Sequence, residues 1–296
     1  MIQLTSLTDK KNIHHHFLLE TPLPLEQCAT SSIEKLKTSA TVLMQDHYKL
    51  YKEYLNIPGW KEVLWAVTCN HQDINFKNLH LSYSTSYEAQ AIRQGFNTKV
   101  KPLGLAGLLR TSDGFFVFGL RTGVAMGGYL CNAPAGHCAP EQPGANVMHA
   151  GFIEELETEL GIHESEIETP YILGHQTDPD FGRSVNTVMY AQSTLTYQEL
   201  QKRHKTARDA ALILKEKGCN FNEVQDELKA QGFLNIDAHE HDAIVAIPDN
   251  QDSISAILET RQFEWNDNGE QRTSPIMDIA RGTLLLLNKA KELNLI

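Results

Sequence analysis

The sequence lacks an excess of positive charge. Its 26 lysines and arginines are outnumbered by 37 aspartates and glutamates, which gives a formal net charge of −11. A surface that binds nucleic acid or an anionic membrane needs a positive electrostatic potential, so neither class of partner is expected. A small polyanionic substrate remains compatible with this charge, provided that a divalent cation offsets it.

A disulfide framework, a signal peptide and a membrane span are also missing. The five cysteines are an odd number without a C-x-x-C pair, which is typical of reduced cytosolic thiols. Residues 1–16 lack the basic-then-apolar pattern of a signal peptide. The longest apolar stretches, such as Ala243–Pro248, are too short to cross a bilayer. We therefore expect a cytoplasmic protein; secretion without a cleaved signal is the alternative.

Three common catalytic signatures are absent. The sequence contains no Gly-x-Ser-x-Gly elbow, no P-loop and no dinucleotide-binding fingerprint. These absences disfavour serine hydrolases, kinases and nicotinamide-dependent oxidoreductases.

The first hundred residues alternate between helical and strand-like patterns, and we predict a smaller N-terminal α+β domain over residues 1–100. The histidines at 14–16 are expected to lie in a flexible polar terminus. The expected elements are a helical stretch over 29–57, strands at Glu62–Cys69 and Leu79–Tyr83, a helix at Tyr87–Gln94 and a basic connector at Phe96–Pro102.

The second domain is predicted over residues 101–296. We expect it to begin with a hairpin, because Asp113-Gly114 separates two apolar runs. A glycine-containing loop and a helix over about 145–160 are expected to follow. Mixed strands and helices indicate α/β or α+β layering. The other expected elements are strands at Tyr171–His175, Val185–Ala191 and Ala243–Ile247, a helical insertion around 196–232, and a closing helix at about Ser274–Leu293.

The helix after the glycine-containing loop is dense in carboxylates. Glu155 and Glu159 are four residues apart, so an α-helix would place both on one face, where like charges repel. Mg²⁺ would remove that repulsion, since it binds one or two carboxylates together with substrate phosphates. Glutamate-rich helix faces are also common as merely solvated surfaces, so the helix alone does not define a site.

The order of hairpin, loop and helix resembles the Nudix hydrolases, whose box reads Gly-x5-Glu-x7-Arg-Glu-U-x-Glu-Glu-x-Gly-U, with U a bulky aliphatic residue. Gly136 opens the box, and the stretch from Glu154 to Ile162 closes it. Glu155 falls on the glutamate after the box arginine, and Glu159 falls on the last glutamate. Glu154 replaces the arginine, Thr158 replaces one metal-binding glutamate, and the loop is four residues longer than in the pattern.

The resemblance extends to a branch of Nudix-type UDP-glucose/UDP-galactose hydrolases with an added N-terminal domain and a degenerate box. It implies an α-β-α sandwich and hydrolysis of a UDP-sugar to UMP and a sugar 1-phosphate. The implied cofactor is Mg²⁺, with Mn²⁺ as the alternative. The supporting stretches are Leu81–Tyr87, Pro102–Leu105, Asn132–His137, Gly182-Arg183 and Met189–Ala191.

The resemblance also assigns roles to individual residues. Glu155 and Glu159 are the implied catalytic metal ligands, and Glu154 would supplement them in place of the ligand lost at Thr158. Glu240 is a candidate base, within a polar stretch, His239–Asp242, that we interpret as a loop rather than a metal cluster. The candidate substrate contacts are Tyr87, Arg121, Asn132 and Arg183.

Three of these substrate contacts have a structural alternative. Arg121 would reach a phosphate or else be an ordinary exposed arginine at a strand end. Arg183 would contact phosphate or sugar or else form a salt bridge within a turn. Tyr87 would stack on uracil or belong to the core. Two rival functions also stay open: the same chemistry on ADP-ribose, a dinucleotide or coenzyme A, and a catalytically impaired Nudix fold that senses nucleotides or binds proteins. Glu154 and Thr158 favour the last of these.

Overall fold

A computed structural model describes residues 2–8, 14–24, 30–34, 63–67, 79–85, 101–122, 127–137, 147–177, 185–267 and 269–296. For the strands before residue 100 it describes the backbone course. These strands are β1 (Ile2–Thr8), β2 (His14–Pro24), β3 (Thr30–Glu34), β4 (Val63–Val67) and β5 (Leu79–Thr85).

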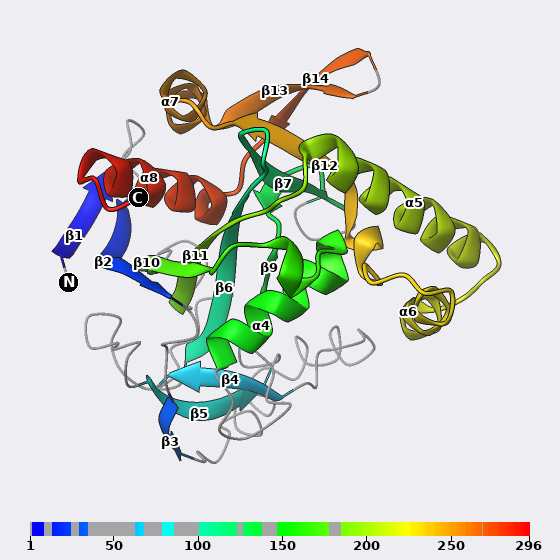
Figure 1. Ribbon diagram of the computed structural model, residues 1–296, viewed down its shortest axis with the longest axis horizontal. Coiled ribbons are helices and arrows are strands. Elements are labelled where there is room, and N and C mark those ends of the chain that lie inside the picture. The colour runs from blue at the N-terminus through cyan, green and yellow to red at the C-terminus, as the bar shows by residue number, and fades with distance from the viewer. Residues whose placement is uncertain are drawn as a thin grey trace, which may run out of the picture.

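The central part of the molecule is a mixed β-sheet (Figure 1). In it β6 and β11 run parallel, while β10 pairs antiparallel with β11 on one side and with β2 on the other. The strands from residue 101 onward are β6 (Lys101–Arg110), β7 (Phe115–Arg121), β8 (Leu130–Asn132), β9 (Ala135–His137), β10 (Tyr171–Thr177), β11 (Val185–Gln192) and β12 (His241–Pro248).

The predicted hairpin is present as β6, a tight turn and β7. Gly114 adopts a φ of 87°, a left-handed conformation that glycine accepts without steric cost. The Thr111 hydroxyl accepts a 3.0 Å hydrogen bond from the Phe115 amide and so closes the turn. Antiparallel pairing then joins β7 to β8 on one side and to β12 on the other. The pairing of β7 with β12 places Arg121, at the end of β7, opposite His241, at the start of β12.

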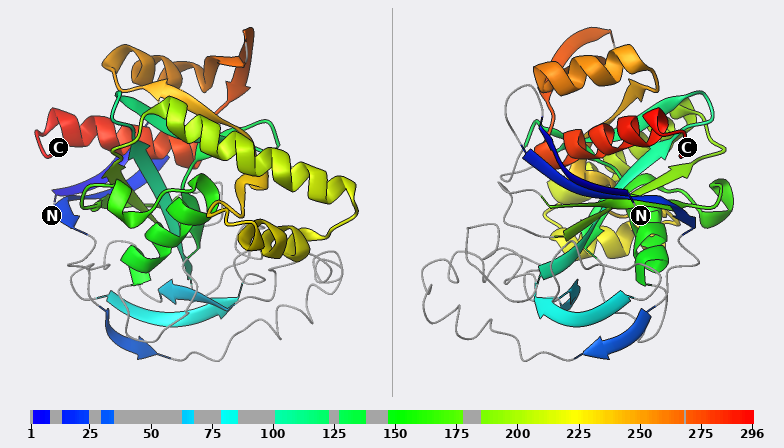
Figure 2. Two further views of the ribbon diagram at one scale, coloured as in Figure 1. Left: turned by 45° about the vertical axis from the view of Figure 1, so that its right-hand side comes forward. Right: turned by 90° about the vertical axis from the view of Figure 1, so that its left-hand side faces the viewer.

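Helices cover both faces of the sheet (Figure 2). The helical elements are α4 (Val147–Glu155) with its π-helical continuation η3 (Leu156–Leu160), η4 (Glu164–Glu166), α5 (Tyr197–Glu216), α6 (Phe221–Ala230), η5 (Ala238–Glu240), α7 (Gln251–Thr260) and α8 (Asp278–Glu292). The insertion helices begin at well-formed caps: Thr196 and Asn220 each accept a hydrogen bond from the amide three residues on.

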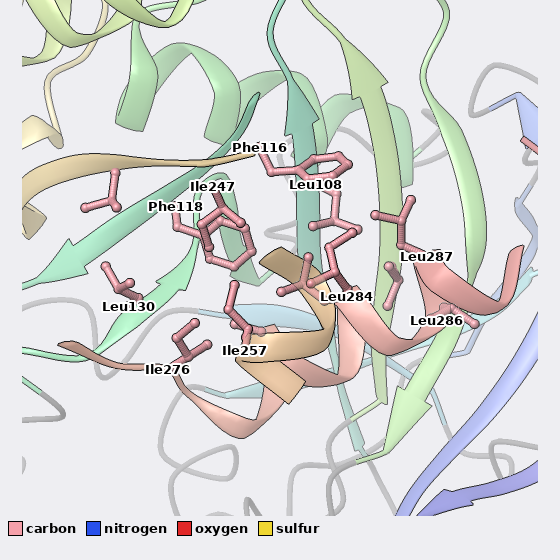
Figure 3. Close-up of a cluster of buried hydrophobic side chains, with 14 of the residues drawn as sticks. Leu108, Phe116, Phe118, Leu130, Ile247, Ile257, Ile276, Leu284, Leu286 and Leu287 are labelled. Atoms are coloured by element: carbon pink, nitrogen blue, oxygen red, sulfur yellow. The ribbon is translucent and has the colours of Figure 1, made fainter. Parts of the chain in front are cut away.

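Alternation along the strands divides the core into two layers. Val117 of β7 packs toward α4 with Phe152 and Leu156, whereas its neighbours Phe116 and Phe118 pack toward α8. Figure 3 shows the second layer, where Leu284 and Leu287 of α8 lie over the sheet. The described part from residue 101 onward is thus an α/β arrangement with a helix–sheet–helix order, as predicted.

Several sequence predictions need correction. The histidines at 14–16 lie in β2, which pairs with β10, so they do not form a loose terminus. Residues 30–34 form a strand paired with β5 rather than the start of a helix. The closing helix begins at Asp278 because the residues before it form a hairpin, β13 (Gln262–Asp267) and β14 (Glu270–Pro275). The expected helix at 87–94 lies outside the described residues.

The other predicted elements from residue 101 onward are confirmed to within a few residues. The strands expected near 171, 185 and 243 correspond to β10, β11 and β12, and the two insertion helices correspond to α5 and α6. Among the described helices, none combines the length and the apolar character that a membrane crossing requires.

Candidate active site

The carboxylate-bearing helix ends in a π-helical turn. α4 runs to Glu155, and η3 continues to Leu160, where Gly161 terminates it with a left-handed φ of 68°. Leu156 and Leu160 anchor the turn in the core, both with no exposed surface. π-helical turns are rare and occur frequently at functional sites, because they change the direction in which side chains project. The helix end therefore presents its glutamates from a fixed, buried scaffold.

Glu155 lies directly against Gly136 of β9. An ideal Cβ atom on Gly136 would lie 1.6 Å from Glu155 Oε1 and 2.4 Å from its carboxyl carbon. The space of a missing side chain is thus occupied by the carboxylate. This contact explains why the loop has a glycine at this position, since any larger residue would displace Glu155.

Glu159 is buried, with 2% of its surface exposed. Its Oε2 accepts a hydrogen bond from the Ala135 amide at 3.3 Å and lies 3.5 Å from Nε2 of His241. The two glutamates of the helix therefore approach consecutive residues of β9, Ala135 and Gly136.

A second segment, between α6 and β12, brings further acidic groups to the same place. Asp237 donates its backbone amide to the Thr158 carbonyl at 2.9 Å, which fastens this segment to the π-helical turn. Glu240, at the end of η5, lies with its Oε2 3.9 Å from Nη2 of Arg121 on β7. Acidic side chains from two separate segments, Glu240 and Glu159, thus act electrostatically on Arg121.

The negative charges raise one another's pKa values. Burial raises the pKa of Glu155 well above its usual range, and Glu159 and Glu240 add to the rise. Burial and then Glu240 raise the pKa of Glu159, against the opposing effect of Arg121. Burial is also the main cause that raises the pKa of Asp237, to about 6. Burial opposes ionisation of Arg121, but its pKa is raised because Cys131 and the acidic neighbours favour the cation.

The donor set suits a hard divalent cation. It consists of carboxylate oxygens, the ligands that Mg²⁺ and Mn²⁺ prefer, and the unbalanced negative charge at Glu155 and Glu159 would be neutralised by such an ion. Within the described residues, no three His, Cys, Asp or Glu side chains are close enough together to hold an ion as they stand. The two glutamates therefore fit a site in which substrate phosphates and water supply the other ligands.

We expect Gly136→Ala to lower activity by about 10- to 100-fold, because the new methyl group displaces the Glu155 carboxylate and small misplacements cost this much. The free energy of unfolding should change by about 1 kcal/mol or less, since the displaced atoms end a flexible side chain. Steady-state kinetics and urea unfolding measure the two effects. In a Glu155→Ala background the same glycine substitution should have little further effect on activity. A further loss of activity of about 10- to 100-fold in that background would contradict the contact between Gly136 and Glu155.

Three buried histidines lie beside the acidic groups. His204 of α5 faces His241 with 6.5 Å between ring centroids, and His239 packs edge-on against Phe221 at 4.8 Å. Burial lowers the pKa of His204 to about 3 and that of His239 to about 4. The rings of His204 and His239 are therefore neutral at physiological pH.

The lowered pKa of His204 predicts a loss of stability in acid. Below pH 6.5 the unfolded chain binds a proton at His204 that the folded chain binds only near pH 3, so stability falls as pH falls through this range. Between pH 7 and pH 5 the contribution is about 2 kcal/mol. Urea unfolding should show that His204→Leu removes this part of the pH dependence. His163→Leu, at a half-exposed histidine, should leave it in place, and equal behaviour of the two variants would refute the assignment.

The predicted site residues do not all lie in one place. It brings together Glu155, Glu159, Glu240 and Arg121, while Glu154 is exposed at the edge of the cluster and adds to the rise in the pKa of Glu155. Asn132 is 1% exposed, and its amide nitrogen donates at 3.0 Å both to the Gly107 carbonyl and to the Thr283 hydroxyl. Asn132 therefore ties β8 to β6 and α8. Tyr87 and Arg183 lie outside the described residues.

Two residues of the cluster were not predicted as functional. Asp237 lies immediately before η5, and His241 is the first residue of β12. The polar stretch 239–242, interpreted from the sequence as a loop, therefore falls in η5 and the start of β12. The available signal was the density of ionisable residues from Asp237 to Asp242, which is unusual immediately before a buried strand.

No family model and no curated protein matches the sequence. Among solved structures, the chain is similar to Tm1382, a candidate Nudix hydrolase, at 14% identity over 50% of this chain and 73% of the other, with a TM-score of 0.32. It is also similar to the Nudix domain of Shewanella oneidensis NrtR, solved with ADP-ribose, at 14% identity over 38% of this chain and 73% of that one, with a TM-score of 0.25. The similarity to Nudix domains is distant, so the site is judged by its own residues.

Proposed function

We propose that this protein hydrolyses the pyrophosphate bond of a nucleoside diphosphate derivative with the help of Mg²⁺, and that its substrate is a UDP-sugar. Water would attack one phosphorus atom of the diphosphate, and the bridging P–O bond would break to give UMP and a sugar 1-phosphate. The observation that supports this proposal most directly is the meeting of Glu155, Glu159 and Glu240 beside Arg121.

The electrostatics of this cluster favour a cation-dependent reaction. The pKa values of Glu155 and Glu159 are raised by burial and by neighbouring carboxylates, so their ionised forms lack sufficient positive charge nearby. Two carboxylates four residues apart on the helix, Glu155 partly buried and Glu159 buried, are suited to hold a divalent ion against a diphosphate. When bound, Mg²⁺ would polarise the phosphate oxygens and lower the pKa of a water molecule.

The remaining charged groups have complementary roles in the proposal. Arg121, about one-third exposed, would donate hydrogen bonds to a phosphate oxygen and stabilise the charge that develops on it. Glu240, also about one-third exposed and opposite Arg121, would accept a proton from the attacking water. Gly136 would keep the backbone clear of Glu155, so that the carboxylate stays in place.

The choice of a UDP-sugar comes from the sequence resemblance. The stretches that carry it include Leu81–Tyr87 and Gly182-Arg183, and the proposed uracil and sugar contacts, Tyr87 and Arg183, belong to these stretches. The polyanionic class of substrate agrees with the net charge of −11 only because the cation offsets the local acidity.

A substrate panel with Mg²⁺ tests the proposal. UDP-glucose, UDP-galactose, ADP-ribose, a dinucleotide and coenzyme A are incubated with the protein, and nucleoside monophosphate and released phosphate esters are quantified. We expect UMP and sugar 1-phosphate from the UDP-sugars, with loss of turnover in Glu155→Gln. Glu157→Gln, on the same helix but partnered with His163 at 3.6 Å, is the matched control and should retain activity.

Other outcomes of the panel separate the rival functions. Turnover of adenine-containing substrates alone would replace the UDP-sugar while keeping the chemistry. A nucleotide-sensing module is the second candidate, because Thr158 occupies a position where the Nudix box has a metal-binding glutamate, and its backbone carbonyl is engaged by Asp237. Nucleotide binding without turnover, unaffected by Glu155→Gln, would favour that candidate and refute the enzymatic proposal.

A further inference from the structure

His241 is a buried polar residue to which the proposed chemistry assigns no role. It has no exposed surface, and neither ring nitrogen has a hydrogen-bond partner among the described residues. A buried imidazole without a partner is costly, so its position calls for an explanation. Its Nε2 atom lies 3.5 Å from Oε2 of Glu159.

Both described contacts of the Glu159 carboxylate are made to the same oxygen. Oε2 accepts from the Ala135 amide at 3.3 Å and faces His241 Nε2 at 3.5 Å. Oε1 takes part in neither contact. The backbone amide and the ring nitrogen approach the same oxygen from two directions, which limits rotation of the carboxylate and leaves the other oxygen to a ligand.

The His241 ring is itself held by the backbone of β7. An ideal Cβ on Gly119 would lie 2.5 Å from His241 Nδ1 and 2.7 Å from its Cγ, so the ring occupies the space above this glycine. The pairing of β12 with β7 is irregular between His241 and Ala243, which is the signature of a bulge. Asp242 is exposed and pairs with Arg208 at 3.0 Å, whereas His241 is directed inward.

We propose that His241 is a positioning residue: seated on Gly119, it orients the Glu159 carboxylate through Oε2, so that Oε1 binds the divalent cation. This inference rests on the proposed function, because it assumes that Glu159 is a metal ligand. Residues that hold a metal ligand in place typically change metal affinity by about 10- to 100-fold when removed.

The test measures binding of Mn²⁺ alone to the full chain, by electron paramagnetic resonance titration, so it does not depend on turnover. We expect His241→Phe to raise the Kd for Mn²⁺ by about 10-fold or more, and His241→Gln, which keeps a donor, to recover part of the affinity. His239→Phe is the matched control, since His239 is 5% exposed and packs against Phe221 instead. Circular dichroism and thermal unfolding establish that each variant is folded.

A double-mutant cycle tests the contact between the His241 ring and Gly119 of β7. Gly119→Ala should weaken Mn²⁺ binding in the wild-type background, where its methyl group meets the ring, and have no further effect in His241→Ala. If His241→Phe binds Mn²⁺ with wild-type affinity while Glu159→Gln loses binding, the positioning role of His241 is refuted and the proposed function is not. Absence of Mn²⁺ binding in the wild-type protein would overturn the proposed function, and this role with it.

Discussion

Glu159→Gln is expected to lower kcat/KM for the proposed diphosphate substrate by about 10²- to 10⁴-fold, because it removes one of the two carboxylates proposed to bind the cation. The glutamine has nearly the same size, and its side-chain oxygen still accepts from the Ala135 amide. The loss should therefore be chemical rather than structural. Steady-state kinetics over a range of Mg²⁺ concentrations measure it, with Glu157→Gln as the control on the same helix.

The same substitution should leave the protein as stable as before, or more stable, in the absence of divalent cations. Folding raises the pKa of Glu159, so over the pH range between the unfolded and folded pKa values stability falls as pH rises. Glutamine does not titrate and avoids this loss. We therefore expect the Tm of Glu159→Gln at pH 8 to be equal to or above that of the wild-type protein, measured by thermal unfolding without divalent cations. A large fall in Tm together with the loss of activity would contradict this account.

Phe152→Ala is expected to destabilise the fold by about 3–5 kcal/mol, the usual cost of removing a fully buried phenylalanine. The ring packs against the backbone of β6: an ideal Cβ on Gly107 would lie 2.9 Å from Phe152 Cε2. Phe152 also lies three residues before Glu155, so a loosened helix should weaken the proposed metal binding as well. Urea unfolding measures the shift in midpoint.

A matched control for this substitution lies on the insertion. Ile213→Ala removes apolar atoms from a side chain that is 52% exposed and should cost about 0.5 kcal/mol or less. Equal effects of the two substitutions would mean that α4 is not held to the sheet by the buried ring. A lower denaturant slope in Phe152→Ala would instead indicate a change in the cooperativity of unfolding.

Local sequence patterns predicted those parts of the fold whose neighbours on the chain are also their neighbours in space. The hairpin around Gly114 and the helix ending at Gly161 depend on turn and cap residues that are visible in a short window. The element missed after β12, α7, has its cap at Asn250, whose side chain accepts from the Ser253 amide. A single capping asparagine is a weaker sequence signal than the apolar run of residues 243–248 that precedes it.

The remaining features depend on pairing across the chain. The polar start of β2 becomes a strand because β10 is there to pair with it. Asp237 and His241 join the acidic cluster because α5 and α6 return the chain to the end of η3, and no window of sequence shows that return. The electrostatic coupling of Glu155 and Glu159, by contrast, could be predicted from their spacing, since both belong to one short helical segment.

The insertion helices also hold the end of the carboxylate-bearing helix. Arg203 of α5 donates to the Gly161 carbonyl at 2.9 Å, and the Asp237 amide donates to the Thr158 carbonyl. Carbonyls at a helix terminus have no partner within the helix, and here they find partners in the insertion and in the segment that leads to Glu240. Mechanically, these parts are coupled: a displacement of α5 would carry the helix end and Glu240 with it. A graft of this helix into another scaffold would need to include residues 197–241 to reproduce the same arrangement.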